Sequence, residues 1–219
     1  MTPILAIVDY IPVIMFGVTG IIIMRDIYNK CSKGAFALVS AGTIMVLWAG
    51  AYKATWKLLY TLNVADFFRM NQQFLPMQAA GFLLMGLGLM AATFLKQGKG
   101  KQYSFLMLPM LAKVIADEGG PEPQTGAMFF IVFMVLGLLG VCVALSVIAA
   151  RMKKPISIIF FVVSFILLLA MGYLGSREFG SDPIMNWVEE CINIAAQICL
   201  LAGVVILDKS GLKERESLK

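Results

Sequence analysis

The chain has 219 residues, of which 60% are hydrophobic and 14% are charged, and its mean hydropathy is +0.86. Soluble domains are about 45–50% apolar and about 25% charged, so this composition excludes a soluble globular fold. The formal net charge of +5 does not indicate nucleic-acid binding, because the basic residues lie in short loops where membrane orientation accounts for them. We therefore expect a multi-pass protein of the plasma or inner membrane, surrounded by lipid bilayer and without a nucleic-acid partner.

Long apolar runs recur along the chain. A helix needs about 20 apolar residues to cross about 30 Å of hydrocarbon. The first run ends at Arg25 and Asp26 without a small-residue cleavage site, which indicates a span rather than a signal peptide. Residues 103–116 form the shortest run, and a re-entrant or interfacial segment is the alternative there. The sequence predicts an all-α single domain over residues 1–219, with spans at 3–24, 35–60, 74–95, 103–116, 127–150, 156–175 and 183–207 and a short tail at 208–219.

The charges of the connections indicate how these spans are oriented. The basic connections are residues 25–33, 96–101, 151–154 and 208–219. The connections between them are neutral or acidic. Because cytoplasmic loops carry an excess of Lys and Arg, the N-terminus is predicted outside and the C-terminus in the cytoplasm. If residues 103–116 did not cross, two basic loops would lie on opposite sides of the membrane, so we expect seven transmembrane helices.

Seven spans in this order suggest a three-one-three arrangement, in which one linking span joins two units of three. At a constant offset of 121 positions, Lys33 aligns with Lys154 and Tyr52 aligns with Tyr173. An internal duplication is one interpretation of these matches. The alternative is chance, because apolar helices resemble one another easily.

The chain contains no histidine, and its four cysteines form no CxxC pair. Haem sites and zinc sites that use histidine, and Ser-His-Asp hydrolysis, each lack a required group. Catalysis would need a carboxylate pair, but the adjacent Glu189 and Glu190 point about 100° apart on a helix. We expect no metal and no cofactor, and we rank an enzyme below transport and sensing.

Polar residues in the last predicted span suggest a functional face. Glu189, Asn193 and Gln197 follow an i, i+4, i+8 spacing, and Glu190 lies beside them. Ionisable groups in a span cost about 2.5–3.5 kcal/mol each on insertion scales, so they usually face the bundle interior or water. Hydrogen bonding between helices is the structural alternative for this stripe.

Other polar groups occur at a similar depth in the outer half. Asp9 lies in the first span, Lys53 and Lys57 in the second and Gln78 in the third. For Lys57 we expect snorkelling to the headgroups, whereas Lys53 lies deeper. The aromatic residues Tyr52 and Trp56 are near the outer end of the second span, where an aromatic belt is the alternative.

If these groups converge, they form an outward-facing, mixed-charge pocket between the first, second, third and seventh helices. Such a pocket suits a small polar or zwitterionic solute, because both signs of charge are present. The predicted substrate-binding residues are Glu189, Asn193, Gln197, Asp9, Lys53, Gln78, Trp56 and Tyr52. The sequence favours a transporter or facilitator. The alternative is a seven-helix sensor or receptor, or a subunit that assembles with itself or with a partner membrane subunit.

The residues Arg25 to Lys33, followed by Trp48 and Tyr52, are similar to the loop and second span of SWEET repeats. With the seven short-looped spans, the topology resembles the SWEET and PQ-loop sugar transporters, and it also resembles the microbial rhodopsins. The Pro-Gln pair, Pro123 and Gln124, lies in a predicted outer loop instead of a span, so the resemblance does not carry sugar transport with it. A retinal pigment would need a lysine in the last span, and residues 183–207 contain none.

Overall fold

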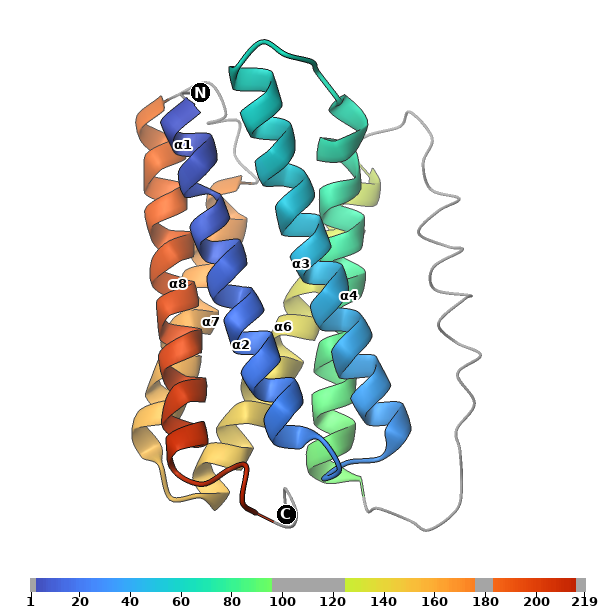
Figure 1. The fold of residues 1–219 in the computed structure, drawn as a ribbon, viewed down its shortest axis with the longest axis vertical. Coiled ribbons are helices and arrows are strands. Elements are labelled where there is room, and N and C mark those ends of the chain that lie inside the picture. The colour runs from blue at the N-terminus through green and yellow to red at the C-terminus, as the bar shows by residue number, and fades with distance from the viewer. Residues whose placement is uncertain (1–2, 96–124, 176–182, 216–219) are drawn as a thin grey trace.

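The computed structural model describes residues 3–95, 125–175 and 183–215, and these residues form a bundle of long helices (Figure 1). Six helical segments in these ranges are long and apolar enough to cross a membrane, with α1 and α2 together making the first. The predicted helical membrane character is therefore confirmed, whereas the segment 103–116 lies outside the described residues. The helices are α1 (Pro3–Val8), α2 (Tyr10–Ile27), α3 (Lys33–Thr61), α4 (Phe68–Phe94), α6 (Thr125–Arg151), α7 (Pro155–Gly175) and α8 (Pro183–Lys209).

The helix α4 begins at Phe68, six residues before the predicted start of the third span at Phe74. The extra turn and a half contains Arg69 and three amide residues, so hydropathy did not reveal it. A helix satisfies its backbone hydrogen bonds whatever its side chains are, and it can therefore continue beyond the apolar stretch.

Pro12 accounts for the break between α1 and α2 at Asp9. Proline has no N–H, so the carbonyl of Val8, four residues earlier, loses its helical partner. The chain nevertheless continues in the same direction, and the Asp9 N–H donates to the Leu5 carbonyl at 3.0 Å. The carboxyl group of Asp9 is thus placed at a joint within the first span.

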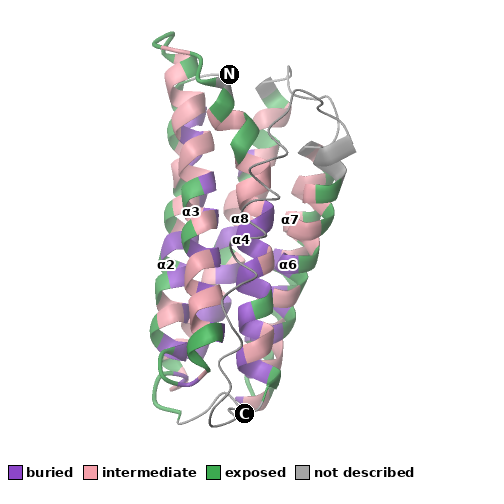
Figure 2. Cartoon of the chain, turned by 90° about the vertical axis from the view of Figure 1, so that its right-hand side faces the viewer, coloured by how far each residue is buried: buried purple, intermediate pink, exposed green. Residues whose placement is uncertain are grey.

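The six spans form a closed ring, in which α2, α3, α4, α6, α7 and α8 each pack against the next and α8 packs against α2. Figure 2 shows the buried residues gathering in the middle and lower parts of this ring. Large apolar side chains also point outward, and Ile14, Ile21 and Ile159 are each more than 60% exposed. Such an apolar exterior is typical of a surface covered by lipid.

The helices α4 and α6 pack backbone to backbone and run in the same direction. A Cβ on Gly86 would lie 2.3 Å from the Gly137 carbonyl oxygen, so no larger residue fits there without a backbone shift. Further along both helices, the Arg151 guanidinium donates to the Thr93 carbonyl at 3.0 Å. In both helices the second contact lies further toward the C-terminus than the first, so α4 and α6 are parallel. The last residue of α4 and the first of α6 therefore lie at opposite ends of the bundle (Figure 1).

The order and direction of α2, α3 and α4 match those of α6, α7 and α8 (Figure 1). In each group of three, the first and third helices run away from the end of the bundle where the N-terminus lies, and the second helix runs back toward it. We name that end the outer end and the opposite one the inner end, following the predicted topology.

We expect Gly137→Ala to lower the free energy of unfolding by about 1–3 kcal/mol, as overpacking does in a tight core. Its Cβ would lie 2.3 Å from the Phe82 carbonyl carbon. The matched control is Gly172→Ala on α7, where a Cβ meets no atom within 4 Å. This control should be neutral or stabilising, because Ala favours a helix over Gly by about 1 kcal/mol. Thermal unfolding in detergent measures both, and equal effects would contradict the close packing of α4 and α6.

Candidate functional site

Asp9 and Lys57 form an ion pair between the joint of the first span and α3. Both side chains are largely buried, with exposures of 7% and 14%. The expectation that Lys57 snorkels to the headgroups is therefore wrong. The reason is that α1 packs against α3 near the outer end and offers a carboxylate to the lysine.

Glu190 on α8 brings a second acid to this pair. Its side chain is buried, and its carboxyl group interacts with that of Asp9 and with the charges of Lys57 and Lys53. The neighbouring Glu189 is only half-buried. Of the two adjacent glutamates, Glu190 is thus the one that faces the interior of the bundle, although the predicted set of binding residues does not contain it.

Helical geometry explains this choice between the two glutamates. Seven residues turn a helix by about 700°, so Glu190 lies about 20° from Gln197 around the helix axis. Glu189 lies about 80° from it by the same rule. Gln197 is buried, with 6% of its surface exposed. The spacing of seven between two polar residues was the signal that distinguishes Glu190 from Glu189.

Lys53 lies one helical turn further into the bundle than Lys57. Its ammonium group lies 4.2 Å from the centroid of the Phe74 ring on α4, within the range of a cation–π interaction. The same ammonium interacts with the charges of Asp9, Glu189 and Glu190. Groups from the first span, α3 and α8 therefore form one cluster, which we call the outer charged cluster: Asp9, Lys53, Lys57, Glu189 and Glu190.

Buried acceptor oxygens without a donor are the chemical signature of this region. Within the described residues, Asp9 Oδ1, Glu190 Oε1 and Gln197 Oε1 are buried and accept no hydrogen bond. Leaving a buried polar atom unsatisfied costs about 1–3 kcal/mol, and more for a charged group. The site therefore favours a bound group that donates hydrogen bonds or carries positive charge.

Among the described residues, no hydrogen bond joins the other predicted binding residues to this cluster. The Trp56 indole N–H donates to Asp66 at 3.0 Å, and its ring stacks on Tyr60 with centroids 5.7 Å apart. The ring of Tyr52 contacts Trp48, which is 55% exposed. The aromatic belt that the sequence offered as an alternative stays a prediction. Gln78 on α4 and Asn193 on α8 are half-buried, and no hydrogen bond joins either to the outer charged cluster in the described ranges.

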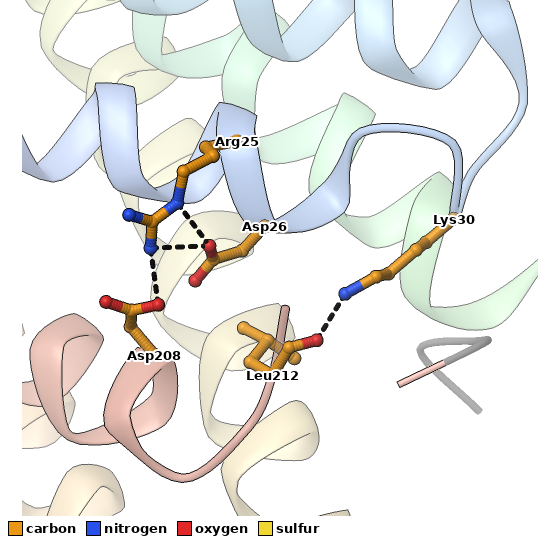
Figure 3. A network of polar contacts seen from close by, with 5 residues as sticks. All are labelled: Arg25, Asp26, Lys30, Asp208 and Leu212. Carbon is orange, nitrogen blue, oxygen red and sulfur yellow. Dashed lines mark hydrogen bonds and ion pairs between the residues drawn. The ribbon is translucent and has the colours of Figure 1, made fainter. Parts of the chain in front are cut away.

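A second polar network joins α2 to α8 at the inner end (Figure 3). The Arg25 guanidinium donates to Asp26 at 2.8 and 2.9 Å, and it also forms an ion pair with Asp208. The ammonium of Lys30 donates to the Leu212 carbonyl. The Asp26 carboxylate is fully buried. Charged groups thus connect α2 with α8 at the inner end of the bundle.

The predicted outward-facing pocket stays a prediction. A hollow of about 440 Å³ lies at the outer end of α3, but it is lined by Tyr60, Thr61, Asn63, Ala65 and Asp66 and not by the outer charged cluster. No protein-family model matches the chain, and no curated protein or solved structure is significantly similar to it. Function is therefore inferred from the geometry of the site.

We expect Lys57→Met to lower the free energy of unfolding by about 3–5 kcal/mol, because it leaves the Asp9 carboxylate buried without its partner. Combining it with Asp9→Asn should restore part of this loss. The control is Lys209→Met, since Lys209 is exposed at the end of α8 and should tolerate the change. Thermal unfolding in detergent measures all three. A Lys57→Met variant as stable as the control would instead support snorkelling.

Proposed function

We propose that this protein is a transporter or facilitator of the cell membrane that binds a small zwitterionic or polar solute at the outer charged cluster. The observation that carries this proposal is the pair of buried, unsatisfied acceptor oxygens on Asp9 and Glu190, in a cluster that also contains the ammonium of Lys53. A third such oxygen, on Gln197, lies about two helical turns from Glu190 along α8. An ammonium group of the solute would donate to the oxygens of Asp9 and Glu190. Its carboxylate would pair with Lys53.

The energetics of a membrane interior favour this type of ligand. Charged groups buried in a medium of low dielectric need partners of opposite sign, and a zwitterion supplies both signs without net charge. A cluster with lysines and acids offers an ionic partner to each end of a zwitterion, whereas a simple anion would meet an excess of acids. The site therefore fits an amino-acid-like or betaine-like solute.

We also infer seven crossings with the N-terminus outside and the C-terminus in the cytoplasm. Parallel α4 and α6 support this inference, because the chain must pass from the inner end of α4 to the outer end of α6. The 29 residues from 96 to 124 suffice, since a helix needs about 20 residues to cross the hydrocarbon. Basic Arg25, Lys30 and Arg151 all lie at the inner end, as a cytoplasmic side requires.

The two interfaces between the three-helix groups differ in a way that supports transport. One interface, α4 against α6, is held by close glycine contacts. The other, α2 against α8, is joined by an ion pair at its inner end and has buried carboxyl oxygens without donors at its outer end. Parallel repeats related by an axis along the membrane normal occur in transporters. In such an arrangement the polar interface can open while the glycine interface stays closed.

Binding is testable without knowledge of the natural solute. Purified protein is heated with alanine or glycine betaine as zwitterionic probes and with glucose as a neutral polar probe. A zwitterion that binds should raise the unfolding temperature, by an amount equivalent to about 2.7 kcal/mol at one hundred times its dissociation constant. Glu190→Gln and Lys53→Met should lose this response, whereas Glu214→Gln, in the exposed tail, should keep it.

Flux of a bound probe into proteoliposomes then separates the two functional classes. Uptake that Glu190→Gln abolishes supports transport. Binding without flux supports a sensor or a subunit of a larger complex. A response that is the same in wild type, Glu190→Gln and Lys53→Met excludes the outer charged cluster as the binding site.

The topology is testable with single cysteines in a chain whose four native cysteines are replaced. In intact cells a membrane-impermeant maleimide should label Asn63→Cys and Gly119→Cys. It should label Gly98→Cys and Lys153→Cys only after permeabilisation. Labelling of positions 98 and 119 from the same side would exclude a crossing between α4 and α6.

A further inference from the structure

We propose that Asp9 and Glu190 share one proton, so that the outer charged cluster is a proton-binding site and the proton is the coupling ion. This inference deepens the proposed function, because it concerns the same site. It rests on which groups face one another and on the charge that they carry together.

Three elements contribute charged groups to the surroundings of the pair. The first span supplies Asp9, α3 supplies Lys53 and Lys57, and α8 supplies Glu189 and Glu190. With all five ionised, two positive charges meet three negative charges, which leaves a net charge of −1. One bound proton makes the cluster neutral, which an apolar membrane interior favours.

The geometry identifies where this proton resides. Asp9 Oδ2 is paired with the ammonium of Lys57. Asp9 Oδ1 and Glu190 Oε1 are both buried acceptors that receive no hydrogen bond from the described residues. A proton bonded to the Glu190 carboxyl group would donate a hydrogen bond to Asp9 Oδ1. One proton would then give both of these buried oxygens a partner. Two carboxyl groups that share a site in this way do not both ionise readily.

Proton binding needs no co-reactant. The proton comes from water, forms one O–H bond on Glu190 and returns to water when that bond breaks. The nearby Tyr10 hydroxyl is already hydrogen-bonded to Thr55 at 2.8 Å, so it does not compete for this role. An ammonium group of a solute would donate to the same two oxygens. Proton and solute therefore exclude each other from the pair.

Infrared difference spectroscopy of the full-length protein in lipid nanodiscs tests the proton site without any solute. A pH titration should show one protonated-carboxyl C=O band that both Glu190→Gln and Asp9→Asn remove. Either change leaves only one carboxyl group in the pair, so no second carboxyl group remains to share the proton with it. Glu189→Gln is the matched control and should keep the band, with its midpoint at lower pH, because one negative charge is gone.

Glu190→Gln and Asp9→Asn test the shared proton independently, so one variant is sufficient if the other does not fold. A carboxyl band that persists in both Glu190→Gln and Asp9→Asn overturns the shared proton, and so does its loss in Glu189→Gln alone. If the band behaves as expected but no probe is transported, the proposed function fails and the proton site stands. If a zwitterion binds and moves while wild type shows no such band, only the proton site fails.

Discussion

Charged contacts between α2 and α8 close the ring of helices, and the rest of the structure depends on them. The first and last helices of the described bundle lie side by side and parallel. The guanidinium of Arg25 forms an ion pair with Asp208 at the inner end. Lipid tails are as apolar as leucine, so apolar surface alone does not drive two helices together in a membrane. Polar groups of this kind decide which helices become neighbours.

The interface between α4 and α6, on the opposite side of the ring, is held by a different force. Gly86 and Gly137 allow α4 and α6 to approach until their backbones touch, and dispersion forces across this contact take the place of the missing hydrophobic effect. Such a contact is lost if the helices separate by even a short distance. Charge pairs tolerate rearrangement better, because water or a solute can replace one partner. The α4–α6 and α2–α8 interfaces therefore differ in how easily each can open.

The outer charged cluster combines features that conflict in a purely structural network. Lys57 pairs with one oxygen of Asp9, but Glu190 adds a carboxylate whose buried oxygen has no donor. A network built only for stability would have satisfied that oxygen or replaced the glutamate by an apolar residue, because a partly satisfied buried network costs free energy. The unsatisfied acceptors are understandable if the site alternates between partners, such as a proton and an ammonium group.

Sequence alone determined that the chain is a bundle of apolar helices, that histidine chemistry is absent, and that acids and lysines gather near one end. Only the tertiary structure decided which of these residues meet. It selected Glu190 over Glu189, paired Lys57 with Asp9, and hydrogen-bonded Trp56 to Asp66. The physical reason is that a membrane helix is apolar on its lipid face as well as on its buried face. Spacing shows which residues share a face, but only packing against neighbouring helices turns that face toward the interior.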